Sequence, residues 1–129
     1  MKVLLQLAAL FTMLAVALGA FGAHGLSSKL PPERLAIFET GVRYQFYHAL
    51  AIFIAVLLFK WKSSGLLLNA GWSFVVGTVL FSGSLYLLAT RDLLGIESWS
   101  RVLGPITPLG GLAFLIGWLL IVVAVSKSF

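Results

Sequence analysis

The densest polar group in this chain lies between Glu39 and His48, immediately before Ala49–Phe59, which contains only apolar residues. Hydrophobic residues make up 60% of the sequence, so polar side chains at this position need a reason. An imidazole can act as an acid or a base, bind a metal or form hydrogen bonds. Ionisable groups within apolar segments are costly and often mark functional sites. This stretch is therefore the strongest candidate for a site.

One face of a helix through this stretch carries Tyr44 and His48, followed at helical spacing by Ala51 and Ala55. Small residues on a face predict close contact with other helices, so we expect His48 to point into the protein. His48 lies twelve residues before Lys60, or about 18 Å at a rise of about 1.5 Å per residue. In an apolar layer about 30 Å thick, that position is well inside the membrane.

A second face carries Glu39 and Arg43, which are four residues apart in the order that favours an ion pair. The long side chain of Arg43 can reach the membrane boundary. We expect this pair to anchor the helix at the interface, while Gln45 lies off both faces.

The composition indicates a single membrane domain over residues 1–129. Charged residues make up 10% of the chain, whereas soluble domains hold about 25%. The net charge is +5, but the nine Lys and Arg residues are scattered at predicted helix ends, which argues against nucleic acid as a partner. The chain has no cysteine, so disulfides and thiolate chemistry are excluded.

Four long apolar runs predict an all-α membrane protein, an antiparallel bundle of four transmembrane helices. A helix needs roughly 20 residues to cross a bilayer, and the expected spans cover residues 3–24, 41–60, 65–90 and 107–126. Residues 32–39 form either a short interfacial helix or an outward extension of the second span, because Pro31-Pro32-Glu33 is typical of a helix start. Thr107-Pro108 predicts the N-cap and first position of the fourth span.

The first span has an alternative interpretation as a signal peptide, because Lys2 precedes an apolar core and small residues follow. Its small residues at helical spacing favour a packed helix. Orientation follows from the lysines at the helix ends, with all four acids on the opposite side. This pattern favours an orientation with both termini in the cytoplasm. The lysines are Lys2, Lys60, Lys62 and Lys127.

Small residues on one face of three spans predict tight packing between helices in lipid. The same faces could also join a homo-oligomer or a partner membrane protein. They are Ala8, Thr12, Ala15, Gly19 and Gly22 in the first span, Ala70, Ser73, Gly77 and Ser84 in the third, and Gly110, Ala113, Gly117 and Ala124 in the fourth.

An antiparallel bundle brings further polar residues toward the level of His48. A structural alternative stays open, in which His48 hydrogen-bonds a neighbouring serine or tyrosine and holds helices together. The two histidines lack a third metal ligand at a suitable spacing and no nucleophile elbow is present, so we expect no metal, cofactor or catalytic residue. The candidate ligand-binding residues are His24, Tyr44, Gln45, His48, Ser82, Ser84 and Thr107.

Four blocks of sequence resemble those of a known family. They make the chain similar to the small membrane proteins of the YgdD and transmembrane protein 256 group, known as domain of unknown function 423. The resemblance implies a four-helix membrane protein, in bacteria one of the inner membrane, and it implies no activity. The segment Arg91–Gly104 is longer than in the family's short forms. The blocks are Gly19–Leu26, Glu39–Ala51, Phe81–Tyr86 and Ile106–Leu112.

These observations favour a non-enzymatic membrane protein that binds a small molecule, a lipid or a partner protein through its extracytoplasmic polar half. In one alternative, His48 and Arg43 line a path in an oligomeric transporter or channel component. In another, His24 and His48 serve as acid and base in a membrane enzyme. A His48 that is hydrogen-bonded in a dry seam would argue against a transport path through a single chain.

Overall fold

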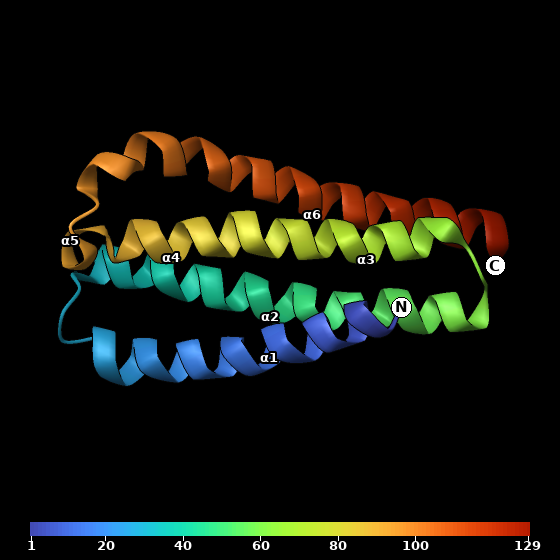
Figure 1. Cartoon of the computed structure of the whole chain (residues 1–129), viewed down its shortest axis with the longest axis horizontal. Helices are drawn as coiled ribbons and strands as arrows, with labels where there is room; N and C mark the ends of the chain where they lie inside the picture. Colours follow the sequence, from blue (N-terminus) through green and yellow to red (C-terminus); the bar gives the residue numbers. More distant parts are fainter.

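Four long antiparallel helical spans make up the fold (Figure 1). The computed structural model describes all residues from 1 to 129. Two single π-helical turns, η1 and η2, continue the neighbouring α-helices, and η3 is a 3₁₀ turn. The prediction of an all-α membrane bundle is confirmed. In chain order the elements are α1 (Lys2–Phe21), η1 (Gly22–Leu26), α2 (Pro32–Trp61), α3 (Gly65–Gly77), η2 (Thr78–Ser82), α4 (Gly83–Ala89), α5 (Arg91–Leu94), η3 (Glu97–Trp99) and α6 (Ser100–Ser128).

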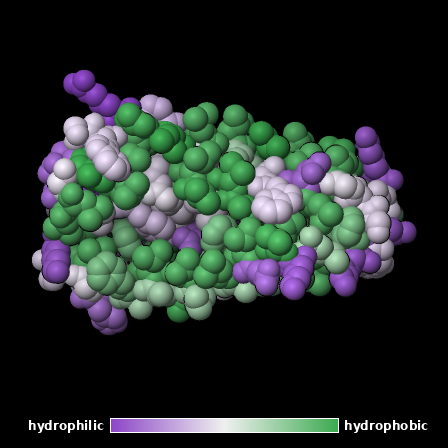
Figure 2. Space-filling view, in the orientation of Figure 1, coloured by the Kyte–Doolittle hydropathy of each residue, from purple (hydrophilic) through white to green (hydrophobic).

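The outer surface of the bundle is suited to lipid. Four helical segments are long and apolar enough to cross a membrane. Large side chains such as Met13, Leu57 and Leu119 are more than half exposed, and contiguous apolar surface of this kind marks contact with a membrane. Apolar residues cover most of the middle of the face in Figure 2, and hydrophilic residues gather mainly toward its ends.

Spans that are neighbours in the chain are also neighbours in the bundle. α2 lies along α1, the continuous helix α3–η2–α4 lies along α2, and α6 lies along α3, η2 and α4. α1 and α6 are therefore the outer helices of the arrangement in Figure 1. The tight connection expected between the second and third spans is present between Trp61 and Gly65.

α1 is a packed helix of the bundle. Leu4 and Ala8 are fully buried in one core cluster with Ile52 of α2 and Phe74 of α3. Gly71 of α3 makes room for Leu4, because a Cβ added there would lie 3.0 Å from its Cδ1. This packing agrees with the packed-helix interpretation of the first span.

Glycines that face phenylalanine rings form the contact between α3 and α6, as the small-residue faces predict. Phe114 of α6 lies over Gly77 of α3. In the reciprocal contact Phe74 of α3 lies over Gly117, where an added Cβ would come within 2.5 Å of its ring. Gly110 lies directly against the backbone of η2. Such close approach supplies the van der Waals contact that holds helices together in lipid.

The second span is longer than expected at its outer end. α2 begins at Pro32 instead of residue 41, so residues 32–39 are the outward extension and form no separate interfacial helix. The extension is tied to α5 by an ion pair in which Arg34 Nη1 lies 2.8 Å from Asp92 Oδ2. The proline and the acid at its start act as the sequence predicts.

The expected start of the fourth span is wrong. α6 begins at Ser100, so Thr107 lies inside the helix and is not its N-cap. Pro105 and Pro108 remove two helical N–H groups, yet the helix continues through them. The carbonyls left without those donors lie at the exposed end of the molecule, where water or lipid headgroups can solvate them. The segment Arg91–Gly104 is consequently largely helical.

Candidate functional site

The imidazole of His48 in α2 lies at the contact with α6, and both of its ring nitrogens are hydrogen-bonded. Nδ1 lies 2.8 Å from the backbone carbonyl oxygen of Tyr44, and the indole Nε1 of Trp118 donates to Nε2 over 3.1 Å. A carbonyl only accepts, so Nδ1 carries the proton, whereas Nε2 accepts from the indole and carries none. The two contacts together select one neutral tautomer of the imidazole.

Aromatic rings surround this imidazole. Phe114 stacks on it with ring centroids 3.6 Å apart and planes 8° apart. Phe74 lies tilted at 5.5 Å, and Tyr44 is stacked at 6.0 Å. The side chain of His48 is 5% exposed. The result is a buried link between α2 and α6, in which the partner from the other helix is Trp118 instead of the serine or tyrosine of the structural alternative.

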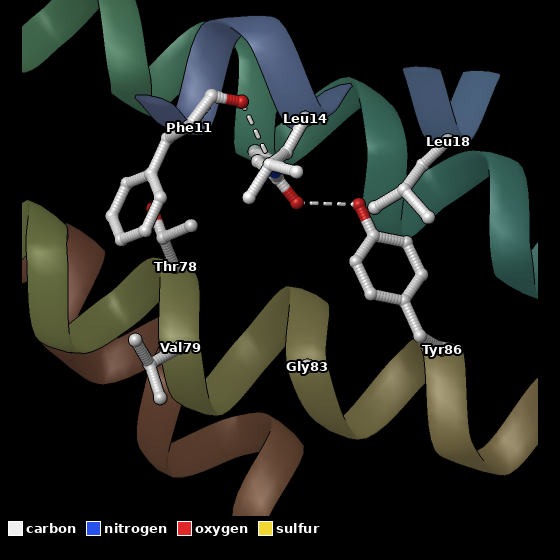
Figure 3. Close-up of a pocket in the computed structure, with 8 residues that line it drawn as sticks. Phe11, Leu14, Leu18, Thr78, Val79, Gly83 and Tyr86 are labelled. Carbon is white, nitrogen blue, oxygen red and sulfur yellow. Dashed lines mark hydrogen bonds between the residues drawn. The ribbon is translucent and has the colours of Figure 1, made fainter. Parts of the chain in front are cut away.

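Gln45 joins three helices at once. Its Nε2 donates to the backbone oxygen of Phe11 in α1 over 2.8 Å, and its Oε1 accepts from the hydroxyl of Tyr86 in α4 over 2.6 Å (Figure 3). Gln45 is buried. Polar groups inside a membrane must find partners within the protein, so this amide is a bridge between α1, α2 and α4.

Ser82 and Ser84 are both buried but bond in different directions. Ser82 Oγ donates to the carbonyl oxygen of Gly41 in α2 over 2.7 Å. Ser84 Oγ shares a 2.6 Å hydrogen bond with the hydroxyl of Thr107 in α6. These predicted site residues are thus links between pairs of helices, and they do not converge with His48 on one pocket.

A cavity of about 240 Å³ lies between α1, α2, η2 and α4. In Figure 3, Thr78 points from η2 and Tyr86 from α4 toward α1, and Gly83 leaves the wall between them free of a side chain. Gln45 is the only predicted site residue that lines this space. The lining residues are Phe11, Leu14, Leu18, Gln45, Thr78, Val79, Gly83 and Tyr86.

Thr78 differs from every other threonine in the chain. Its Oγ1 is the one buried side-chain nitrogen or oxygen without a hydrogen-bond partner. Thr12, Thr40, Thr90 and Thr107 all donate to the carbonyl oxygen four residues earlier. A buried hydroxyl with no partner costs free energy, so its position in a cavity wall is a feature to explain.

The two histidines are not brought together. His24 is exposed in η1, close to the level of Phe38, because Gly22 faces that ring. Phe38 is ten residues from His48, which is about 15 Å along α2. No group of three or more His, Asp or Glu side chains lies together in a way that could hold a metal ion.

The expected ion pair between Glu39 and Arg43 is not formed. Arg43 donates to Thr40 Oγ1 over 3.2 Å instead, and Glu39 and Arg43 are both exposed. An exposed pair at this helical spacing is worth only about 0.3–0.5 kcal/mol, so solvation and a nearby hydroxyl compete with it.

Four residues of the site were not among the predicted site residues. Tyr86 stood in one of the four family-like blocks but was not a candidate. Phe11 contributes a backbone carbonyl, which no side-chain pattern reveals. Thr78 is a single hydroxyl in an apolar run. Trp118 carried a usable signal, because an indole N–H deep in a membrane segment needs an acceptor, and His48 was the available one.

Comparison with known proteins places the chain in a family. Residues 18–111 match the family described as protein of unknown function (DUF423). The chain belongs to this family. The part that matches DUF423 includes Gln45, His48, Thr78 and Tyr86, whereas Trp118 lies beyond it.

Several similar proteins match nearly the whole chain. The UPF0382 membrane protein YwdK of Bacillus subtilis (strain 168) is 49% identical over 128 residues, which is 98% of each chain. The UPF0382 membrane proteins SERP0230 of Staphylococcus epidermidis and SH2409 of Staphylococcus haemolyticus are 45% and 43% identical, each over 98% of both chains. These names describe membrane proteins and give no activity. No solved structure matches the chain.

Proposed function

We propose that this protein is a non-enzymatic membrane protein that binds a lipid or another membrane-dissolved small molecule between α1, α2, η2 and α4. The observation that carries the proposal is the cavity of about 240 Å³ at this place. The space is open on the side of the bundle, so a molecule from the surroundings can enter it. It is bordered by two buried polar side chains, Gln45 and Thr78.

The position of the cavity supports access from the bilayer. Leu14 of α1 and Val79 of η2 line it and are 39% and 58% exposed on the side of the bundle. Both residues lie near the middle of apolar helical segments. A ligand dissolved among lipid chains would reach this opening without crossing a polar layer.

The volume suits a part of a lipid. An apolar cavity of about 150 Å³ holds a benzene ring, and pockets for drug-sized ligands run from roughly 300 to 1,000 Å³. At about 240 Å³ the cavity would hold a ring or a short section of chain. The rest of the ligand would stay in the surrounding bilayer.

A transport path along His48 and Arg43 has less support. Both imidazole nitrogens of His48 bond to groups of the protein, and its side chain is buried. An acid–base pair made of His24 and His48 has less support as well, because the two lie far apart along the bundle.

We further infer that the protein lies in the inner membrane with both termini in the cytoplasm. Both chain ends lie at the same end of the bundle in Figure 1. Lys2, Lys60, Lys62 and Lys127 flank the spans there, and no acidic side chain accompanies them. Lysine-rich short segments favour the cytoplasmic side.

Purification of the protein in a mild detergent tests the proposed binding. Gly83 lines the cavity, and a Cβ added to it meets no atom within 4 Å, so Gly83→Leu fills the space from its wall. Gly65→Leu is the matched control, because Gly65 is equally open and lies at the start of α3. Mass spectrometry should find a co-purifying lipid with the wild type and the control, and much less with Gly83→Leu. Equal amounts in all three would contradict the proposal.

A further inference from the structure

The wall of the cavity carries no charge. None of its lining residues is a Lys, Arg, His, Asp or Glu. A phosphate, carboxylate or ammonium group would therefore lose its hydration without gaining an opposite charge. This composition disfavours the charged headgroups of most membrane lipids.

Three polar side chains stand in the wall, although nearly all of the surface that faces the cavity is carbon. The amide of Gln45 and the hydroxyl of Tyr86 satisfy one another, with one N–H of the amide bound to Phe11. Thr78 Oγ1 has no partner at all. An oxygen atom on a ligand would give this hydroxyl the partner that it lacks within the protein.

A simple rotation could present the hydroxyl of Thr78 to a ligand. Its oxygen is covered in this structure, while the side chain lines the cavity. A change of χ1 between staggered rotamers moves the hydroxyl to a new position. Thr78 also begins the π-helical turn η2, and such turns are frequent at functional sites.

We propose that the cavity selects an uncharged lipid that carries a hydroxyl or carbonyl oxygen on a hydrocarbon body, and that Thr78 hydrogen-bonds this oxygen. The inference rests on the proposed function, since it names the chemistry of a ligand in the same cavity. A purely hydrocarbon occupant, such as an acyl chain with no oxygen in contact, is the competing outcome.

Photoreactive analogues of hexadecanol, hexadecane and hexadecyltrimethylammonium test this selection on the full chain in lipid nanodiscs. Labelling of peptides that contain Leu14 or Val79 reports occupancy of the cavity, and titration gives an apparent affinity for each probe. We expect the alcohol to bind most tightly and the permanently charged probe least tightly. Equal binding of the alcohol and the alkane, or tight binding of the charged probe, would overturn the inference.

Variants of Thr78 separate hydrogen bonding from shape. Thr78→Val has nearly the same shape without the hydroxyl and should weaken binding of the alcohol about tenfold, the effect of one hydrogen bond in an apolar site, with the alkane unchanged. Thr78→Ser keeps the hydroxyl and should retain the preference for the alcohol. A loss that is equal for both probes, or no loss, would refute the role of Thr78.

Gly83→Leu distinguishes failure of the inference from failure of the proposed function. If it removes labelling by every probe while the wild type shows no preference for the alcohol, the cavity binds lipid but does not recognise oxygen. If it leaves labelling unchanged, the cavity is not the binding site and both proposals fall. The inference is supported when Gly83→Leu abolishes labelling that the wild type shows preferentially with the alcohol.

Discussion

The indole N–H of Trp118 donates to Nε2 of His48 over 3.1 Å and so joins α6 to α2 across 70 positions of sequence. Each group satisfies the other in a place that lacks water, where an unpaired polar group is costly. The bond satisfies a buried imidazole nitrogen and links the two helices.

Trp118→Phe should destabilise the protein, because it keeps an aromatic ring but leaves Nε2 of His48 without a donor. The expected loss is about 1 kcal/mol in the free energy of unfolding, the scale of interhelical hydrogen bonds in membranes. Unfolding in mixed detergent micelles, followed by circular dichroism, measures it. Trp72→Phe is the matched control, because Trp72 is 45% exposed against 41% for Trp118 but does not bond to His48, and it should change little. Similar losses for both variants would show that the bond is unimportant.

Tyr86→Phe should cost a comparable amount, because it removes the donor to Gln45 Oε1 in the interior of the bundle. A double-mutant cycle with Gln45→Leu should give a coupling energy of about 1 kcal/mol. Tyr47→Phe supplies the matched control, since Tyr47 is 54% exposed. A coupling energy near zero would mean that the two side chains contribute independently.

The transmembrane spans and the faces on which they pack could be predicted from the sequence, because both depend on the residues within each segment. Length and apolarity fix which segments cross the membrane, and small residues at helical spacing mark the faces that pack. Gly77 and Gly117 accordingly meet phenylalanine rings from the opposite helix. The short connection after Lys60 was equally clear from its composition.

The partners of the polar side chains could not be predicted, because they depend on how the helices rotate and pair. Ser82, Ser84 and Tyr44 were the partners considered for His48 across helices. The structure pairs His48 with the backbone oxygen of Tyr44 on its own helix and with Trp118 of α6. The seam between α2 and α6 is set by packing across the whole bundle. The predicted start of α6 was wrong for a different reason. Prolines near an exposed helix end cost less free energy than prolines in a helix interior, so the helix continues through them.

Gly110→Ala should be strongly destabilising. The Cβ of the new alanine would lie 2.7 Å from the Cα of Phe81, and backbone atoms cannot move away as a side chain can. We expect a loss of about 1–3 kcal/mol, as for overpacked cores. Gly65→Ala, where the added Cβ meets nothing within 4 Å, should change stability by less than about 1 kcal/mol. Comparable thermal unfolding of both variants would refute the tight contact between α6 and η2.

Single cysteines can establish the orientation, because the chain has none of its own. Ser63→Cys lies in the connection after α2, and Ser98→Cys lies in η3 at the opposite end; both positions are exposed. A membrane-impermeant maleimide added to intact cells should label Ser98→Cys at once and Ser63→Cys only after permeabilisation. The reverse pattern would invert the inferred topology.

The pairing of spans that are neighbours in the chain has a consequence for biogenesis. Each span after α1 meets a partner that is already in the membrane, so assembly can follow the order of synthesis. α1 and α2 can pair as soon as both are in the membrane, and α3 then joins them. His48 Nε2 nevertheless stays without its donor until α6 arrives, because Trp118 lies in that helix. The last span to enter the bundle is therefore the one that completes the hydrogen bonds of this imidazole.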